Sequence, residues 1–215
     1  MPENIYVLSA LALIIGYGFG CFSTAYVVGK ANHIDIRSYG SGNAGTTNAM
    51  RTLGKKAGII TYIGDVLKAV IPILIARFLL LADNPNSDLI CFIIGFGVVL
   101  GHNYPVWLRF KGGKGIAVTS GVFLAVVPQI AVFALLLFVL IALISKYISL
   151  ASICAIIFAG TWIVINYDFS VWYIIVIACY VLLALWQHRA NIVRLLHGTE
   201  NKIGQHKPPL VEKTK

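Results

Sequence analysis

The apolar segments of this chain restrict its fold more than any other feature of the sequence. Long apolar runs, separated by short connectors, lie at about 4–29, 57–81, 89–108, 116–144, 148–165 and 170–187. Roughly 20 apolar helical residues cross a hydrocarbon core about 30 Å thick. The hydrophobic fraction is 59% and the charged fraction only 12%, whereas soluble proteins have about 25% charged residues. The sequence therefore predicts an all-α integral membrane protein without a separate soluble domain.

The first apolar run differs from a cleaved signal peptide. No basic segment precedes residues 4–29, and no small-residue cleavage pattern follows them. A signal peptide would carry both features. We therefore expect this run to be a retained first helix.

The fourth apolar run is too long for one comfortable span. About 29 residues at 1.5 Å each would make a helix of about 43 Å. Within 116–144 lies Pro128, which removes a backbone donor and disfavours helix at the residue before it. A break near Pro128 would give two short spans, one of about a dozen residues, and a bundle of seven transmembrane helices.

The basic residues decide the orientation of these helices. Lys and Arg cluster at 30–56, at 109–114 and from 188 onward, whereas 82–88 and 166–168 contain neither. Basic loops remain on the cytoplasmic side of a membrane. With the break near Pro128, all three basic clusters lie inside, so the N-terminus is predicted outside and the C-terminus in the cytoplasm.

The rest of the composition indicates one membrane domain. We expect residues 1–206 to form it, with a polar, disordered tail at 207–215. The net charge of +9 fits anionic lipid head groups or anionic substrates better than nucleic acid in such a protein. The cysteines all lie in apolar runs and are interpreted as small core residues: Cys21, Cys91, Cys154 and Cys179.

A glycine-rich segment, GSGNAG, lies between the first two spans. Gly40, Gly42 and Gly45 match the spacing of a dinucleotide-binding turn, but that motif requires a preceding strand within a βαβ unit. What remains is closely spaced backbone N–H groups that can approach an anion, with hydroxyls nearby. The alternative is a connector that binds nothing.

A second segment, GHNYPVWLRFKGGKG, follows the third span. It differs from a P-loop because Leu108 occupies the position of the first glycine and Gly115 follows Lys114. Two lysines, Lys111 and Lys114, nevertheless alternate with glycines, an arrangement that suits an oxyanion. The alternative is a basic loop at the membrane surface.

Charged and amide side chains also occur on the predicted helices. Asp65 and Lys68 are three residues apart and share a helix face. Charges at that depth mark either function or mutual pairing. His188 and Asn191 share a face at the end of the last span, where they can bond a hydroxyl or a phosphate.

Several catalytic classes lack support in the sequence. The five histidines are scattered without a metal-binding motif. Tyr39 and Asn43 stand where a G-x-S-x-G motif around Ser41 would need glycine. No histidine is followed five residues later by aspartate, as in the H-x-x-x-x-D arrangement of the commoner glycerolipid acyltransferases. We expect neither metal nor cofactor.

Three segments together carry a family resemblance. GSGNAGTTN with RTLGKK, then GHNYPVWLRFKGGKG, then HRANIVRLLHGTE resemble, in order and spacing, the three motifs of the bacterial acyl-phosphate:glycerol-3-phosphate acyltransferases. The resemblance extends to about Glu200. It implies a seven-helix enzyme of the bacterial cytoplasmic membrane, with its active site facing the cytoplasm. Such an enzyme transfers an acyl group from acyl phosphate to the 1-hydroxyl of glycerol 3-phosphate, giving lysophosphatidic acid and phosphate, the first acylation in phospholipid synthesis.

Site residues follow from these motifs. We expect the catalytic residues to be Ser41, Arg51, Lys114, His188 and Asn191. We expect substrate binding by Gly40, Gly42, Asn43, Thr47, Asn48, Lys55, Asp65, Lys68, His102, Asn103, Lys111, Gly112, Gly113, Gly115, Arg194 and Glu200. The expected partners are acyl phosphate, glycerol 3-phosphate and membrane lipid, and no oligomeric state follows from the sequence.

The sequence leaves two alternatives open. The base that takes the glycerol proton is either His188 or the phosphate of the donor, and the lack of a carboxylate beside His188 favours the donor. The alternative function is transport of a small phosphorylated solute, which predicts inverted repeats and a site near the midplane. No repeat is visible, and the polar segments lie at helix ends.

Overall fold

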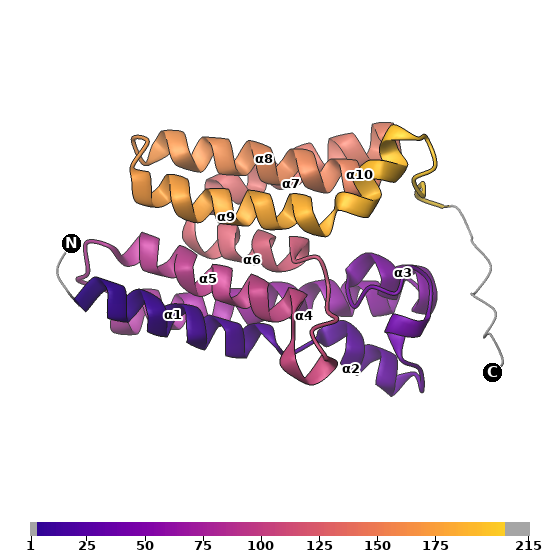
Figure 1. The fold of residues 1–215 in the computed structure, drawn as a ribbon, viewed down its shortest axis with the longest axis horizontal. Helices are drawn as coiled ribbons and strands as arrows, with labels where there is room; N and C mark the ends of the chain where they lie inside the picture. The colour runs from indigo at the N-terminus through magenta and orange to yellow at the C-terminus, as the bar shows by residue number, and fades with distance from the viewer. Residues whose placement is uncertain (1–3, 205–215) are drawn as a thin grey trace.

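The computed structural model describes residues 4–204, and within this range the chain is helical with short connectors (Figure 1). The predicted tail at 207–215 and the last residues of the predicted domain lie outside this range. The long helices are α1 (Asn4–Gly20), α4 (Lys55–Ile75), α5 (Ser87–Asn103), α7 (Pro128–Ser145), α8 (Ile148–Asn166) and α9 (Val171–Gln187). The shorter ones are α2 (Thr24–Ala31), α3 (Thr46–Leu53), α6 (Ile116–Val126) and α10 (Arg189–Leu196).

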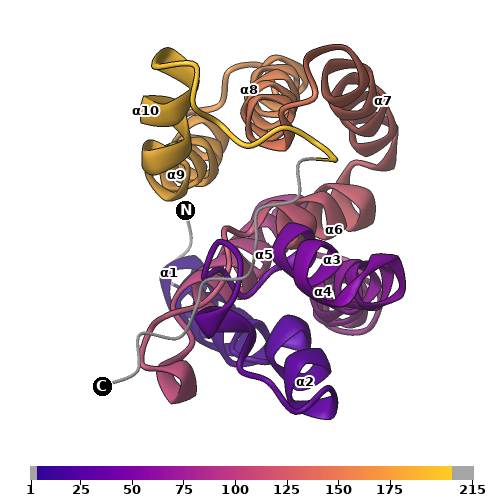
Figure 2. The same ribbon diagram turned by 90° about the vertical axis from the view of Figure 1, so that its right-hand side faces the viewer.

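The helices form two groups with α6 between them. Helices α1 to α5 make one group, and α7 to α10 make the other (Figures 1 and 2). The main core joins both groups around Phe92 of α5, Val122 of α6 and Tyr180 of α9. The Tyr180 hydroxyl donates to the Phe92 carbonyl at 2.7 Å, so the two groups are linked by a hydrogen bond as well as by packing.

The lengths of the helices fit a multi-pass membrane protein. Five segments are long and apolar enough to span a membrane, or six if α9 and α10, bent by 59°, count as one. Helix α6 is apolar but has only 11 residues, which gives about 17 Å at 1.5 Å per residue. It covers about half of a hydrocarbon core.

The predicted break near Pro128 is confirmed. Pro128 is the first residue of α7, where its missing N–H costs nothing. The last carbonyls of α6, at Ala125 and Val126, accept hydrogen bonds from Arg77 Nη1 at 3.2 and 3.1 Å. Arg77 also pairs with Asp88 at 3.0 Å. A cation at this helix end matches the partial negative charge of the free carbonyls, so the short helix has a stable end inside the bundle.

The prediction of one helix over 4–29 is wrong in detail. Helix α1 ends at Gly20 and α2 begins at Thr24, with Ser23 as its N-cap. Lys68 of α4 donates to the carbonyls of Gly20 and Phe22 at 3.2 and 2.7 Å. The break is stable because an ammonium from another helix satisfies carbonyls that the helix leaves free.

Glycines allow α1 and α5 to cross closely. Gly16 and Gly20 on α1 face Gly97 and Gly101 on α5, each pair being four residues apart. A Cβ on any of the four would lie 2.1–2.3 Å from a backbone oxygen of the other helix. Small residues four apart are typical of tightly packed membrane helices.

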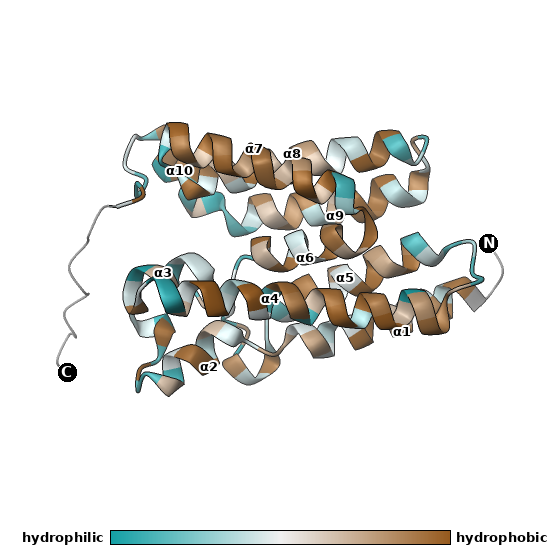
Figure 3. Cartoon of the chain, turned by 180° about the vertical axis from the view of Figure 1, so that it is seen from behind, coloured by the Kyte–Doolittle hydropathy of each residue, from teal (hydrophilic) through white to brown (hydrophobic). Residues whose placement is uncertain are grey.

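The surface divides along the length of the bundle. Hydrophobic residues cover the long helices, and hydrophilic residues gather at the two ends (Figure 3). One end carries α2, α3, α10 and most of the basic residues. The prediction for the cysteines is wrong for Cys179, which lies exposed on the outside of α9, whereas Cys21 and Cys91 are buried and Cys154 is half-buried.

Candidate active site

All three polar segments of the sequence meet at the end that carries α3 and α10. The first and second segments are joined by the Ala44 N–H, which donates to the Gly112 carbonyl at 3.3 Å. Arg37 adds a second link, from Nη1 to the Leu108 carbonyl at 2.9 Å. The second and third segments are joined through Lys114 and Asn191. The tertiary structure therefore builds one polar site from residues about 150 positions apart along the chain.

The first segment is a turn held by one amide. Asn48 Oδ1 accepts from the Ser41 N–H at 2.8 Å, and Nδ2 donates to the Ile36 and Tyr39 carbonyls at 3.0 Å each. Gly40 and Gly42 have φ values of 60° and 72°, a region that favours glycine. The Asn48 amide is thus occupied by its own loop, and Ser41 is held at the surface.

The second segment packs against the end of α5. The N–H groups of Gly112 and Gly113 donate to the carbonyls of Asn103 and His102 at 3.1 and 3.0 Å. A Cβ on Gly112 would lie 2.0 Å from the His102 carbonyl oxygen, and one on Gly113 would lie 2.0 Å from His102 Nε2. Glycine is required at both positions because the loop lies directly on α5.

A hydrogen-bonded chain connects the second segment to the third. Lys114 Nζ donates to Asn191 Oδ1, and Asn191 Nδ2 donates to Glu200 Oε1 at 2.8 Å. Glu200 also accepts from Arg194 Nε at 2.7 Å and from the Ser149 hydroxyl at 3.1 Å. Asn191 and Glu200 are buried. Glu200 therefore fixes the residue that orients Lys114.

The electrostatics of this chain favour an anion. Burial lowers the pKa of Lys114 to about 8, Glu200 opposes the shift, and the charges of Arg194 and Arg51 add to it. The charges of Arg194 and Arg51 thus act on Lys114, and the opposing carboxylate of Glu200 is already bonded to Ser149, Asn191 and Arg194. The Arg51 side chain makes no hydrogen bond or ion pair with any described residue.

His188 adds an acceptor to this site. It is buried where α9 ends and α10 begins, and its Nδ1 lies 2.8 Å from the Ala184 carbonyl. A carbonyl only accepts, so Nδ1 carries a proton, and in the neutral form of the ring Nε2 is an acceptor. No described carboxylate bonds to the ring.

Buried polar atoms without partners occur next to the glycine loop formed by residues 112–115. Both amide atoms of Asn103 lack a hydrogen-bond partner among the described residues, and Asn103 Oδ1 lies 2.9 Å from a Cβ built on Gly115. The Thr46 hydroxyl, at the start of α3, also lacks a partner. Unsatisfied buried polar groups cost about 1–3 kcal/mol each, a cost that a polar ligand or a water molecule bound here would offset.

Asp65 and Lys68 form a separate buried cluster with His102. Lys68 Nζ lies 3.2 Å from Asp65 Oδ1 and 2.8 Å from His102 Nδ1. This cluster has no hydrogen bond to the chain of Lys114 and Asn191, but His102 touches Gly113. The structure therefore places Asp65 and Lys68 behind the glycine loop.

The other predicted residues lie around the site without bonds to it. The side chains of Asn43, Thr47, Lys55 and Lys111 make no hydrogen bond or ion pair among the described residues. Sequence reasoning missed Ser149, which gave no signal because it lies in an apolar run. Thr46, in the first motif, was expected only as one of the hydroxyls near the glycines. Among residues 4–204, no group of three His, Cys, Asp or Glu is placed to hold a metal.

Comparisons with known proteins give a consistent result. The family described as Glycerol-3-phosphate acyltransferase matches residues 10–198. A glycerol-3-phosphate acyltransferase of Thermoanaerobacter sp. (strain X514) is 44% identical over 200 residues, covering 92% of this chain and 96% of that protein. One of Clostridioides difficile (strain 630) is 43% identical over 196 residues, covering 90% and 95%.

Two crystal structures share the fold. They are the glycerol 3-phosphate and the lysophosphatidic acid forms of PlsY (YgiH), an integral membrane glycerol 3-phosphate acyltransferase, with TM-scores of 0.82 and 0.80. Both are 38% identical in sequence and cover 91% of this chain, and the match takes in 96% and 95% of the PlsY chains. The chain belongs to the glycerol-3-phosphate acyltransferase family.

Proposed function

We propose that this chain transfers an acyl group from acyl phosphate to the 1-hydroxyl of glycerol 3-phosphate at the cytoplasmic face of a bacterial membrane. The observation that carries the proposal is the surplus of positive charge at the site, where the charges of Arg51 and Arg194 act on Lys114 and are opposed by Glu200, which is already hydrogen-bonded. Both proposed substrates bring phosphate to this charge. Family membership supports acylation and not the transporter alternative.

The three polar segments have separate tasks in this proposal. The N–H groups of Gly112 and Gly113 are bonded to the end of α5, so the phosphate is received by the Asn103 amide, which has no partner among the described residues, beside Lys114. Arg51 and Lys114 neutralise its charge. Ser41 and His188 hold the glycerol hydroxyl, and Asn191 orients Lys114.

The reaction needs little chemical assistance from the protein. The glycerol 1-hydroxyl oxygen attacks the acyl carbon, the bond from that carbon to the phosphate oxygen breaks, and the hydroxyl proton passes to the departing phosphate. Acyl phosphate is a mixed anhydride with a good leaving group, so positioning and charge neutralisation carry the catalysis. His188 then acts as a hydrogen-bond acceptor, consistent with an imidazole that makes no hydrogen bond to a carboxylate among the described residues.

The membrane arrangement is part of the proposal. We infer seven spans, formed by α1 with α2, α4, α5, the short α6, α7, α8 and α9. The end with α2, α3 and α10 faces the cytoplasm, because its connectors hold most of the basic residues. The N-terminus then lies outside.

The decisive experiment compares acyl donors. Purified protein in detergent or lipid is incubated with glycerol 3-phosphate and either palmitoyl phosphate or palmitoyl-CoA, and lysophosphatidic acid and free phosphate are measured. We expect one phosphate per product from palmitoyl phosphate and no product from palmitoyl-CoA. Product from palmitoyl-CoA alone would refute the donor, and no product from either, with the protein folded, would refute the function.

A labelling experiment tests the orientation. His33→Cys, after α2, and Asp83→Cys, between α4 and α5, lie at opposite ends of the bundle and are exposed. A membrane-impermeant maleimide on intact cells should label Asp83→Cys at once and His33→Cys only after the cells are opened. The reverse order would overturn the proposed orientation, and the unsubstituted protein controls for the four native cysteines.

A further inference from the structure

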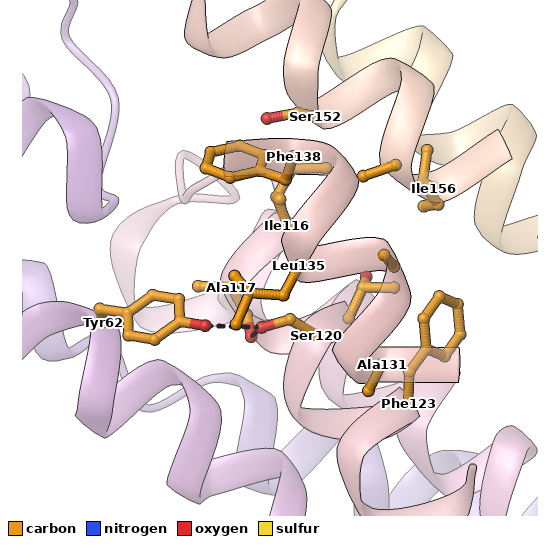
Figure 4. Close-up of a pocket in the computed structure, with 13 residues that line it drawn as sticks. Tyr62, Ile116, Ala117, Ser120, Phe123, Ala131, Leu135, Phe138, Ser152 and Ile156 are labelled. Carbon is orange, nitrogen blue, oxygen red and sulfur yellow. Dashed lines mark hydrogen bonds between the residues drawn. The ribbon is translucent and has the colours of Figure 1, made fainter. Parts of the chain in front are cut away.

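The second polar segment has an outward-facing part that the site does not use. Residues 105–111 form a tight turn, called the anchor turn here, between the end of α5 and the glycine loop. The turn contains a short 3-10 helix, Val106–Leu108, and projects on the side of the bundle away from α8 and α9 (Figures 1 and 2). The described residues that line the apolar pocket between α4, α6, α7 and α8 (Figure 4) include none of these positions. The anchor turn is therefore a separate surface.

The backbone of the anchor turn is rigid and strained. The Pro105 carbonyl accepts from the N–H groups of Leu108 and Phe110 at 3.1 and 3.0 Å. Arg109 and Phe110 have φ values of 55° and 59°, a region that bulky side chains rarely adopt. Both side chains are exposed, so packing inside the protein does not explain the strain. Backbone strain is concentrated at functional sites, which indicates a partner outside the protein.

The apolar side chains of the anchor turn are exposed but held in place. Trp107 is 70% exposed and Phe110 is 59% exposed. The indole Nε1 of Trp107 nevertheless donates to the Cys21 carbonyl at 3.2 Å. Aromatic rings with one polar edge are typical of the boundary between the membrane core and its head groups. The anchor turn therefore has the character of a surface that meets lipid head groups.

The charge of the anchor turn is not balanced by the protein. The side chains of Arg109 and Lys111 are exposed and make no hydrogen bond or ion pair with any described residue. Residues 101–115 contain neither aspartate nor glutamate. Arg37 bonds to the Leu108 carbonyl at 2.9 Å, but its own charge is already paired with Asp35 at 2.7 Å. The unbalanced positive charge is complementary to an anionic head group.

We propose that the anchor turn binds the head group of an anionic phospholipid through Arg109, while its two aromatic rings lie among the lipids, and that the bound lipid fixes the loop that carries Lys114. Gly112 follows the anchor turn directly, and its N–H donates to the Asn103 carbonyl at 3.1 Å. A lipid that holds the turn therefore also holds the loop against α5. The second part of this inference rests on the proposed function.

The lipid site can be tested without an activity assay. Protein in phosphatidylcholine vesicles receives equal mole fractions of brominated phosphatidylglycerol or brominated phosphatidylcholine, and the quenching of tryptophan fluorescence by each is measured. We expect stronger quenching by phosphatidylglycerol. Arg109→Gln should lower this preference about fivefold, the effect of one basic side chain at an anionic surface. Trp107→Phe should remove most of the preference, because it removes the tryptophan next to the site.

The matched control is another arginine beside an exposed tryptophan at the same end of the bundle. The Arg189 guanidinium lies 4.5 Å from the centre of the Trp186 ring. Arg189→Gln should leave the preference for phosphatidylglycerol unchanged. If Arg189→Gln lowered the preference as much as Arg109→Gln, the preference would be a general property of this basic end, and the lipid site would be overturned.

The link to the site is tested by acyl transfer in the same kinds of vesicle without bromine. Phosphatidylglycerol should raise kcat/KM for glycerol 3-phosphate in the unsubstituted protein. Arg109→Gln should lose this rise and keep the activity that is seen in phosphatidylcholine alone. Both proteins are assayed in identical vesicles, so repulsion between the anionic lipid and the anionic substrate is the same for both.

Each other outcome counts against one part of the inference. Equal quenching by the two brominated lipids in the unsubstituted protein would overturn the lipid site. Selective quenching with no effect of phosphatidylglycerol on kcat/KM would overturn the link to the Lys114 loop. Loss of activity by Arg109→Gln in phosphatidylcholine alone would show that Arg109 acts without the lipid. No product in any vesicle, with selective quenching retained, would refute the proposed function and support the lipid site.

Discussion

Two lysines of this molecule are withdrawn from solvent in different ways. Lys68 is buried within the helices, and its ammonium has Asp65, His102 and two backbone carbonyls as partners. Lys114 is half-buried in a loop at the end of the bundle, and its ammonium has one hydrogen-bond partner among the described residues, Asn191. The protein supplies all the hydrogen-bond and ion-pair partners that the Lys68 ammonium needs, so this lysine is saturated, whereas Lys114 is not.

This difference distinguishes a structural lysine, Lys68, from a lysine that we propose binds the substrate, Lys114. Burying an ammonium is costly unless other groups replace its water. Around Lys68 the replacement is complete, so this lysine joins α1, α4 and α5. Around Lys114 the neighbouring charges include Arg51 and Arg194, and in the proposed function a substrate anion balances them.

The largest effect should come from breaking the saturated cluster. Lys68→Met leaves Asp65 buried without its cation, and breaking a buried pair costs about 3–5 kcal/mol. We expect the free energy of unfolding, measured in mixed detergent, to fall by this amount. The double variant Asp65→Asn/Lys68→Met should recover most of it. If Lys68→Met kept full stability and lost only activity, the two lysines would have the same role.

Lys114→Met should show the opposite pattern. Loss of a charge that neutralises the substrate should reduce kcat/KM by about 10²–10³, as for other lost electrostatic donors. Stability should remain close to that of the unsubstituted protein, because the removed ammonium has few partners. Acyl transfer and thermal unfolding are measured on the same preparation. Unfolding at a clearly lower temperature would contradict the comparison.

The pH dependence tests the charge of Lys114 directly. Its pKa is lowered to about 8, so the ammonium is charged below that pH and loses its proton as the pH rises through it. We expect kcat/KM for glycerol 3-phosphate to fall up to about tenfold per pH unit above this value. Lys114→Arg keeps its charge at high pH, so its profile should be flat there. If Lys114→Arg showed the same fall in kcat/KM, the fall would belong to a titrating group other than Lys114.

The smallest expected effects are opposite shifts of this profile. Glu200 raises the pKa of Lys114 and Arg194 lowers it. Glu200→Gln should therefore move the fall in kcat/KM to lower pH, and Arg194→Gln should move it to higher pH, each by a fraction of a unit. Arg189→Gln, on the same helix but bonded to the Trp186 carbonyl, is the matched control. If both substitutions moved the fall in the same direction, Glu200 would act on Lys114 by holding the loop and not through its charge.

Much of the fold followed from local properties of the sequence. The apolar runs predicted every long helix because the length needed to cross a membrane is fixed. The break at Pro128 was predicted because proline acts on its own neighbours. The break between α1 and α2 was not, since it depends on Lys68, which is distant in sequence.

The candidate site was predictable by residue and only partly by role. The motifs identified Lys114, Asn191, Arg194 and Glu200, which the structure joins in one hydrogen-bonded chain. They gave no indication that the Asn48 amide holds its own turn. They also gave none that Ser149, in an apolar run, bonds to Glu200.

By itself the sequence determined that this is a helical membrane protein with three polar segments, because helix length and apolar composition are local quantities. The tertiary structure decided which polar groups are saturated and which remain open to a ligand. That distinction depends on distances between residues far apart in the chain, as the partners of Lys68 and Lys114 show. Hydrogen bonding and desolvation act over a few ångströms, so only the folded arrangement fixes them.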